Sequence, residues 1–201
     1  MTTICAFPTG DGRVIVGSDQ QRTYKNLVVP CGPKWRINGG RAAAACGHSR
    51  AATLLSEGAK DLLADTGPDV PGGTSSAFVF WERYIASAQR YGCAPVEVHR
   101  EPFKDYGADF LYTDRGRLWH IASEGGVITE MHQFWAVGSG APYALGAWYG
   151  ASEMATGLPG VTRMMRVCLE AAIKFDTSSG GEPWVSMVLS KSDGHTDHHQ
   201  V

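Results

Sequence analysis

Apolar and polar positions follow two different periods along this chain, and the segments with each period are grouped. Residues 2–7 and 13–18 are short runs rich in apolar and β-branched residues, joined by the turn-forming run 8–12. This pattern predicts a β-hairpin at the start of the chain. Small residues from Ala42 to Cys46 predict a closely packed strand. Further extended segments are expected around 27–29 and 34–37.

From about residue 49 the apolar positions recur every three to four residues, which is typical of an amphipathic helix. We expect helices at 49–65 and 75–91, separated by a connector at 66–73 that is rich in proline and glycine. Pro142 stands where a first helical turn accepts proline. The later elements are expected as strands at 110–112, 118–121 and 134–137, helices at 142–156 and 161–175, and a last strand at 184–189.

These elements form separate blocks of strands and of helices. Such blocks favour antiparallel sheets with helices on the outer faces, because a parallel sheet needs strands and helices in alternation. The sequence therefore predicts an α+β fold in one domain, residues 1–190, followed by a polar tail at 191–201 that we expect to be frayed.

Composition narrows the class of protein. Of the 201 residues, 43% are hydrophobic and 19% charged, which is enough apolar material for a folded core. The net charge of −2 gives no indication of a nucleic acid or membrane-surface partner. The first eight residues lack the features of a signal peptide, and the five cysteines form no CxxC pair. We expect buried thiols in a cytoplasmic protein without a membrane span.

Three motifs point to other chemistry, and each departs from its pattern. Residues 46–51 resemble a serine nucleophile elbow, but Ala51 replaces the last glycine and the surrounding elements do not alternate as in an α/β-hydrolase. Residues 138–140 resemble the start of a dinucleotide-binding turn, but Tyr143 replaces its third glycine. Histidines in the tail lack a partnering carboxylate cluster, so we expect neither metal nor cofactor. These histidines are His195, His198 and His199.

Thr2 is a candidate nucleophile because of its position. Removal of Met1 would leave Thr2 with a hydroxyl nucleophile and its own general base, the α-amine, in one residue. An unperturbed α-amine has a pKa of about 7.7–8.0, already close to neutral pH.

With Thr2 as the first landmark, the sequence resembles the proteasome β-subunit family, in particular its bacterial relatives of the HslV type. Six segments, in order from residue 2 to about 189, carry this resemblance. They are the Thr2–Ile4 start with its hairpin, Val14–Asp19 ending in the family's aspartate, Lys34 near the place of its lysine, Cys46–Gly47 before a helix, Ala136–Ala144 with the GSG turn, and Asp176–Gly181 as the D-x-x-S-G-G segment.

The resemblance implies a four-layer αββα sandwich, the N-terminal nucleophile hydrolase fold, and a role for each matching residue. Thr2 Oγ would attack a peptide carbonyl. Lys34, held by Asp19, would lower the pKa of the α-amine and favour deprotonation of the hydroxyl. The resemblance assigns the orientation of the amine and of a water molecule to Ser139, Asp176 and Ser179.

Two further residues have implied roles at the substrate. The backbone N–H of Gly47 would donate to the tetrahedral oxyanion. Ala45 is small, so we expect it to leave an open, apolar pocket for the side chain that precedes the scissile bond. Each of the candidate residues also has a structural interpretation: Thr2 as an ordinary strand residue, Asp19 as a turn cap, Lys34 as a solvated charge, and the two serines as turn formers.

The function implied is that of a threonine-type endopeptidase that cleaves unfolded polypeptides. It would work inside stacked rings of 12 or 14 identical subunits, fed by an ATPase ring. A catalytically silent ring that retains Met1 and a small-molecule amidase are the alternatives. The spacing from Asp19 to Lys34 and the long charged segment Cys93–Asp105 depart from the HslV pattern, and fit Anbu or the betaproteobacterial proteasome homologue as well.

Overall fold

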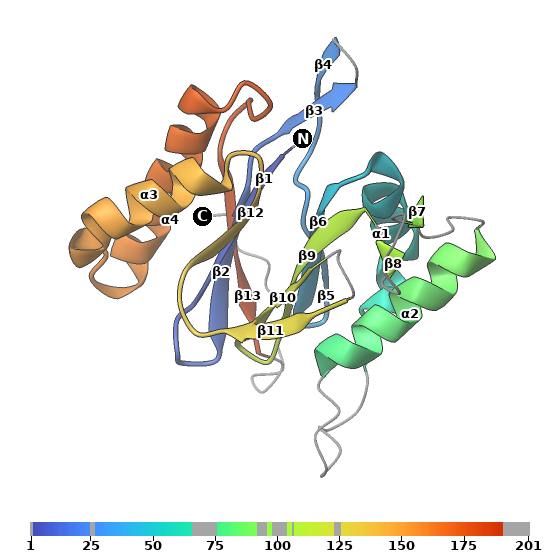
Figure 1. The fold of residues 1–201 in the computed structure, drawn as a ribbon. Helices are drawn as coiled ribbons and strands as arrows, with labels where there is room; N and C mark the ends of the chain where they lie inside the picture. The colour runs from blue at the N-terminus through green and yellow to red at the C-terminus, as the bar shows by residue number, and fades with distance from the viewer. Residues whose placement is uncertain are drawn as a thin grey trace.

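The computed structural model describes residues 2–24, 27–65, 76–91, 96–97, 104–105, 107–122 and 126–190. Two antiparallel sheets lie face to face, and a pair of helices covers the outer side of each (Figure 1). The layers are α3 and α4, the first sheet, the second sheet, and α1 and α2. This arrangement confirms the expected α+β sandwich.

The first sheet places the start of the chain against two other segments. Its strand order is β12-β1-β2-β13, with all neighbours antiparallel. The register pairs Thr3 with Gly138 on one side, and Ile4 with Ser18 on the other. The beginning of β1 therefore lies between the ends of β2 and β12. The strands are β1 Thr3–Pro8, β2 Arg13–Ser18, β12 Trp135–Gly138 and β13 Trp184–Leu189.

The second sheet has the order β11-β10-β9-β6-β5 and is also antiparallel. Its strands are β5 Arg36–Asn38, β6 Arg41–Gly47, β9 Ala108–Asp114, β10 Arg117–Ile121 and β11 Ile128–Met131. Two short ribbons lie outside both sheets. They are β3 Gln21–Tyr24 with β4 Leu27–Pro30, and β7 Val96–Glu97 with β8 Lys104–Asp105.

The largest differences from the predicted helix boundaries are in α4 and α3; α1 also ends three residues early, at Leu62. The helix α4 begins at Gly157 rather than at 161, because Pro159 lies in the first turn, where its missing N–H has no helical partner to lose. The helix α3 ends at Ala151, and a 3₁₀ turn, η1, follows it instead of more α-helix. The helices are α1 Ser49–Leu62, α2 Ser76–Arg90, α3 Ala141–Ala151, η1 Ser152–Met154 and α4 Gly157–Phe175.

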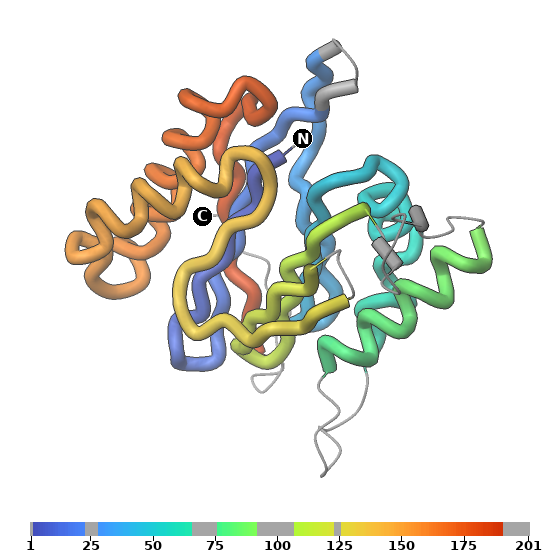
Figure 2. Tube along the Cα trace, in the orientation of Figure 1, coloured from blue at the N-terminus to red at the C-terminus, as the bar shows by residue number. Residues whose placement is uncertain are grey.

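Strand β6 shows how the small residues serve the sandwich. Ala43 and Ala45 pack against α1 and α2, while Ala42, Ala44 and Cys46 face the first sheet. Residues of a strand point alternately to its two faces, so β6 is buried on both sides. The tube in Figure 2 shows the N-terminal strand, in blue, beside the yellow segment that leads into α3.

Four strands were not predicted from the sequence: β3, β11 and the two short strands β7 and β8. Strand β11 is partly exposed at the sheet edge, so it lacks the apolar run that signals a buried strand. Strand β3 is polar and belongs to a ribbon outside the core. The connector at 66–73 and the tail at 191–201 with its three histidines lie outside the described residues. No helix within the described ranges is long and apolar enough to cross a membrane.

Candidate active site

Asp19 is the residue around which the site is built. It follows the last residue of β2 and is completely buried. Its carboxylate accepts hydrogen bonds from the backbone N–H groups of Thr3 at 2.8 Å, Gln21 at 3.2 Å and Gly180 at 3.2 Å. Three donors from three segments of the chain hold the carboxylate in one orientation.

Lys34 forms an ion pair with this carboxylate. Its Nζ lies 2.5 Å from Asp19 Oδ1, and the two side chains are 8% and 0% exposed. The backbone N–H of Lys34 donates to Ser18 Oγ at 3.3 Å, which ties the loop before β5 to the end of β2. Burial lowers the pKa of Lys34 below its usual value, and the charge of Asp19 opposes that shift.

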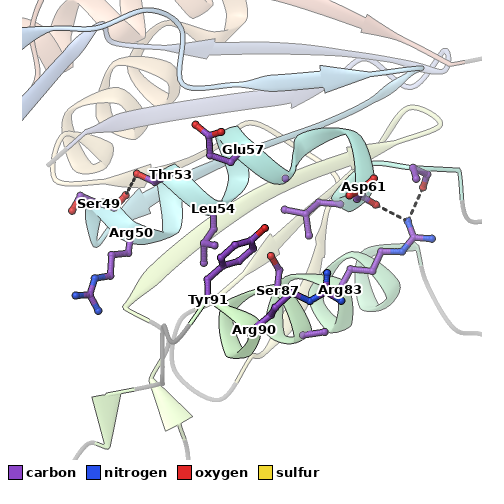
Figure 3. A pocket seen from close by; sticks show the side chains of 14 residues that line it. Ser49, Arg50, Thr53, Leu54, Glu57, Asp61, Arg83, Ser87, Arg90 and Tyr91 are labelled. Carbon is purple, nitrogen blue, oxygen red and sulfur yellow. Dashed lines mark hydrogen bonds between the residues drawn. The ribbon is translucent and has the colours of Figure 1, made fainter.

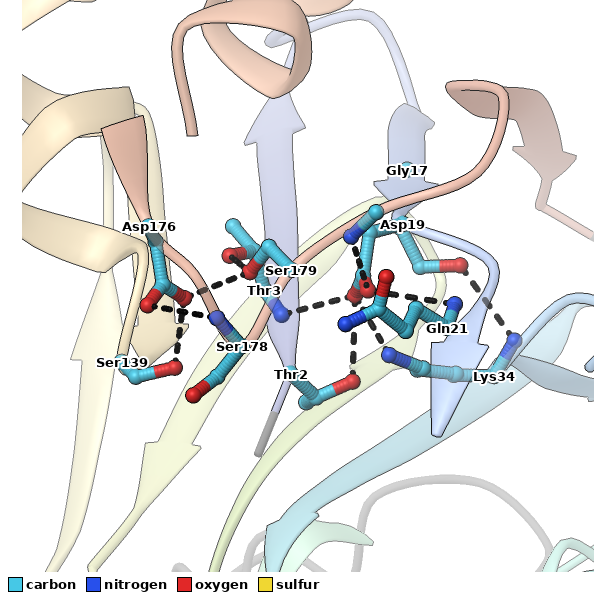
Figure 4. A network of polar contacts seen from close by, with 12 residues as sticks. Thr2, Thr3, Gly17, Asp19, Gln21, Lys34, Ser139, Asp176, Ser178 and Ser179 are labelled. Carbon is cyan, nitrogen blue, oxygen red and sulfur yellow. Dashed lines mark hydrogen bonds and ion pairs between the residues drawn. The ribbon is translucent and has the colours of Figure 1, made fainter. Parts of the chain in front are cut away.

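Thr2 lies next to this ion pair. Its Oγ1 donates to Asp19 Oδ1 at 3.1 Å, the same oxygen that Lys34 contacts. Figure 4 shows the Thr2 hydroxyl directed toward Asp19 and Lys34. The structure therefore brings together three of the residues predicted from the sequence.

A second polar network is centred on Asp176, directly after α4. Its Oδ2 accepts from Ser139 Oγ at 2.6 Å and Ser179 Oγ at 2.7 Å, and its Oδ1 accepts from the N–H of Ser178 at 3.1 Å. Burial acts to raise the pKa of Asp176, but these hydrogen bonds outweigh it and hold the pKa below its ordinary value. In Figure 4 Thr2 lies between this network and the Asp19–Lys34 pair.

Thr3 links the two networks, and the sequence analysis did not single it out. Its Oγ1 lies 2.6 Å from Ser179 Oγ. Because Ser179 gives its one hydroxyl proton to Asp176, Thr3 is the donor in this pair. Consecutive residues of an extended chain point to opposite sides, so Thr3 faces away from the ion pair that Thr2 contacts. Nothing in the local sequence indicates that this side meets Ser179.

Gly138, the residue before Ser139, lies too close to the start of the chain for any side chain to fit. It has φ +102°, and a Cβ there would lie 1.9 Å from the carbonyl oxygen of Thr2. Only glycine lets the end of β12 approach the first residues of the chain this closely. Gly140 is similarly confined, because a Cβ there would lie 2.1 Å from Thr3 Oγ1 and 3.0 Å from Ser179 Oγ.

A cavity of about 310 Å³ opens beside Thr2. Its walls come from the β3–β4 ribbon, the loop before β5, the end of β6 and the first turns of α1. Gly47 and Ala45, the two residues for which the sequence resemblance implies a role at the substrate, belong to the wall. The lining residues are Thr2, Arg22, Val29, Lys34, Arg36, Ala45, Cys46, Gly47, Ser49 and Ala52.

The lining of this cavity combines apolar and cationic side chains. Ala45, Val29 and Ala52 are apolar, but Arg22 and Arg36 also line the walls. Neither arginine was identified from the sequence, because nothing in the spacing of residues 22 and 36 shows that both line a cavity with Ala45.

A larger hollow of about 930 Å³ lies between α1 and α2 (Figure 3). Its polar side chains come from exposed helix faces, and Arg83 Nη1 is bound to the carbonyl oxygen of Ala64 at 2.8 Å. His48, which stands before Ser49 in the elbow-like motif, instead caps α1 by accepting from the N–H of Arg50 at 3.2 Å. Within the described residues no three His, Cys, Asp or Glu side chains gather as a metal site.

Comparison of the fold with known structures gives a consistent answer, although no family model matches the sequence. BPH from Thiobacillus denitrificans, in complex with epoxomicin, superposes with a TM-score of 0.72 at 19% identity, over 94% of this chain and 98% of BPH. The chain has a proteasome-like fold. A mutant of Anbu from Hyphomicrobium sp. strain MC1 has a TM-score of 0.72 at 13% identity, over 100% and 87% of the two chains.

HslV from Trypanosoma brucei shares the same fold, with a TM-score of 0.62 at 17% identity over 94% of this chain and 99% of HslV. At these identities the comparison establishes the arrangement of the layers and does not transfer residue roles. The chemistry of Thr2 therefore has to be argued from its own surroundings.

Proposed function

We propose that the chain is a threonine-type endopeptidase in which removal of Met1 exposes Thr2 as the nucleophile. The observation that carries this proposal is the Thr2 hydroxyl, hydrogen-bonded to the carboxylate of the buried Asp19–Lys34 pair and open to a cavity. A hydroxyl placed beside a fixed ammonium group, at the edge of a space that admits substrate, has the surroundings that an activated nucleophile needs.

In the first step the Thr2 hydroxyl proton passes to its α-amine, and Oγ forms a bond to the carbonyl carbon of the scissile peptide. The positive charge of Lys34 favours the deprotonated oxygen, and Asp19 holds Lys34 in place. The N–H of Gly47, in the cavity wall, is the proposed donor to the oxyanion.

In the second step the tetrahedral intermediate collapses. The C–N bond breaks, and the leaving amine takes the proton from the α-ammonium group of Thr2, which leaves an ester. A water molecule then gives a proton to the amine and attacks the ester carbon, the C–O bond breaks, and Thr2 Oγ regains its proton. We assign the orientation of amine and water to Ser139, Asp176 and Ser179.

The test is the intact mass of the purified protein before and after incubation with epoxomicin, the peptide epoxyketone bound in the BPH structure. A stable adduct of an epoxyketone needs both a hydroxyl and a free α-amine on one residue. We expect loss of Met1 and one adduct per chain, no adduct with Thr2→Ala, and an adduct retained with the matched control Thr2→Ser. Retained Met1 without an adduct would overturn the proposal in favour of a silent ring.

We further propose that identical subunits form stacked rings of 12 or 14 chains, which receive polypeptides from an ATPase ring. Support comes from apolar side chains on the outer helices: the rings of Tyr143 and Phe175 lie 5.9 Å apart and are 43% and 59% exposed. Met154, after α3, is 77% exposed. Grouped exposed apolar residues mark contact surfaces. A monomer mass in native mass spectrometry would contradict the assembly.

A further inference from the structure

The cavity beside Thr2 has an excess of positive charge in its walls. Of its lining residues, Arg22, Lys34 and Arg36 are cationic, and none is a carboxylate. Lys34 is neutralised by Asp19, which lies behind it. Within the part of the chain that the structure describes, neither arginine forms an ion pair with a carboxylate. Among the described residues, these two positive charges therefore have no carboxylate partner.

Arg36 is fixed in place by neutral partners. Its Nη1 donates to the carbonyl oxygens of Pro33 at 2.7 Å and Trp35 at 3.1 Å. Its Nε and Nη2 donate to Ser56 Oγ on α1 at 3.0 and 2.7 Å. A guanidinium group has five N–H donors, so these four bonds leave one on Nη2. The group is thus pre-oriented, and its charge is not balanced by its own contacts.

Arg22 lines the cavity from the β3–β4 ribbon. It stands on β3 directly across from Val29 on β4, and both residues line the cavity. Its side chain is exposed. Burial lowers the pKa of Arg36, and the charge of Arg22 lowers it further, so the two guanidinium groups are close enough to repel each other. An anion between them would relieve this repulsion.

We infer that this cavity binds the acidic side chain of the substrate residue whose carbonyl group is attacked by Thr2, which makes Arg22 and Arg36 specificity-determining residues. The inference rests on the proposed peptidase function. Because Thr2 lies in the cavity wall, the residue whose carbonyl carbon meets its Oγ places its side chain in the adjacent space. Val29, Ala45 and Ala52 pack against the methylene groups, and the arginines bind the carboxylate.

The size of the cavity agrees with this occupant. About 310 Å³ is ample for a glutamate side chain, which is extended and carries its charge at the end. A leucine side chain fits the space equally well, but it would leave both guanidinium groups without an anion. Charge therefore separates the two classes of substrate, whereas volume does not.

The experiment compares kcat/KM for fluorogenic peptides that differ only in the residue before the scissile bond: Glu, Gln, Leu or Lys. We expect Glu to exceed Gln by about tenfold or more, because a desolvated carboxylate on arginine gains charge-assisted hydrogen bonds that the amide lacks. This ratio should decrease as salt is added, since Arg22 is exposed.

Charge variants identify the groups responsible. Arg22→Gln should reduce the Glu-to-Gln ratio severalfold, and Arg22→Glu should bring the Lys peptide above the Glu peptide. Arg36→Lys keeps the positive charge but loses the guanidinium contacts with Ser56. Its Glu-to-Gln ratio is therefore compared with its urea unfolding curve, which shows whether the variant is destabilised. Arg163→Gln, on the exposed face of α4 across the sandwich, is the matched control and should change nothing.

The outcomes separate this inference from the proposed function. An epoxomicin adduct on Thr2 with equal or faster cleavage after Leu, unaffected by either arginine variant, would overturn the acidic preference and leave the peptidase intact. Absence of both adduct and peptide cleavage would overturn the two together. A Glu preference that the Arg22 variants do not change would remove Arg22 from the assignment.

Discussion

Lys34 Nζ lies 2.5 Å from Asp19 Oδ1, in a part of the molecule where neither side chain is appreciably exposed. A buried ion pair contributes little net stability, because the desolvation of both charges offsets their attraction. Its value here is positional: it keeps an ammonium group beside the Thr2 hydroxyl without adding net charge to the interior.

Asp19→Asn should therefore destabilise the fold as well as abolish activity. The variant leaves the Lys34 charge buried without its partner, a change that costs about 3 kcal/mol or more. Urea unfolding measures this loss. The double variant Asp19→Asn/Lys34→Met removes both charges and should recover much of the stability but no activity. If the double variant lost as much stability as Asp19→Asn and Lys34→Met together, the two charges would not be coupled.

The pH dependence of kcat/KM should be bell-shaped. The rate rises as the α-amine of Thr2 loses its proton, and the positive charge of Lys34 should place this limb below the unperturbed α-amine pKa of about 7.7–8.0. It falls again when Lys34 loses its charge, and burial places that alkaline limb below the ordinary lysine value of 10.5. Lys34→Arg, which does not titrate in this range, should retain the acidic limb and lose the alkaline one, whatever its absolute rate.

Gly138→Ala should lower activity strongly, although the substitution adds only one methyl group. A Cβ at this position would lie 1.9 Å from the carbonyl oxygen of Thr2, so the nucleophile must move. We expect at least about a hundredfold loss in rate, since small displacements in an active site have effects of this order. Gly146→Ala is the control: a Cβ there meets nothing within 4 Å, and it should stabilise α3 by about 0.5–1 kcal/mol.

Asp176→Asn should change the acid stability of the protein. The hydrogen bonds from Ser139 and Ser179 outweigh burial and lower the pKa of Asp176 in the folded state from its ordinary 3.8. Its contribution is therefore present above pH 3.8 and is lost as the pH falls through the lower folded-state pKa. At pH 7 the variant should be less stable by about 1–2 kcal/mol. The difference between the two urea curves should shrink as the pH falls below 3.8; a constant difference would contradict this assignment.

The sandwich was predictable from the sequence because its determinants are local. The apolar period changes between blocks, and Pro142 marks the first turn of α3. The ribbon formed by β3 and β4 was predictable only in part: the apolar run at 27–29 predicts β4, whereas the polar strand β3 lacks the pattern of a buried strand. Its position depends on contacts such as the N–H of Cys31 donating to the carbonyl oxygen of Gln20 at 2.8 Å.

The residues of the candidate site also differ in whether they could be predicted from the sequence. Thr2, Asp19 and Lys34 could be named because a sequence resemblance fixes residues one at a time, and their roles stay predictions until tested. Thr3 and Arg36 could not be named, because their importance arises from partners 176 and 20 positions away, Ser179 and Ser56. Contacts over such distances follow from the packing of layers rather than from local pattern.

The ribbon that carries Arg22 and Val29 contributes no residue to the three apolar clusters formed by the described part of the chain. Substitutions in it therefore escape most of the constraints that packing imposes on a core position. The Thr2 hydroxyl and its ion pair, by contrast, are set by the ends of β1 and β2, inside the sandwich. Substitutions in the ribbon can accordingly change substrate specificity while the catalytic groups stay in place. We therefore expect the sequences of related chains to diverge faster in this ribbon than around Asp19.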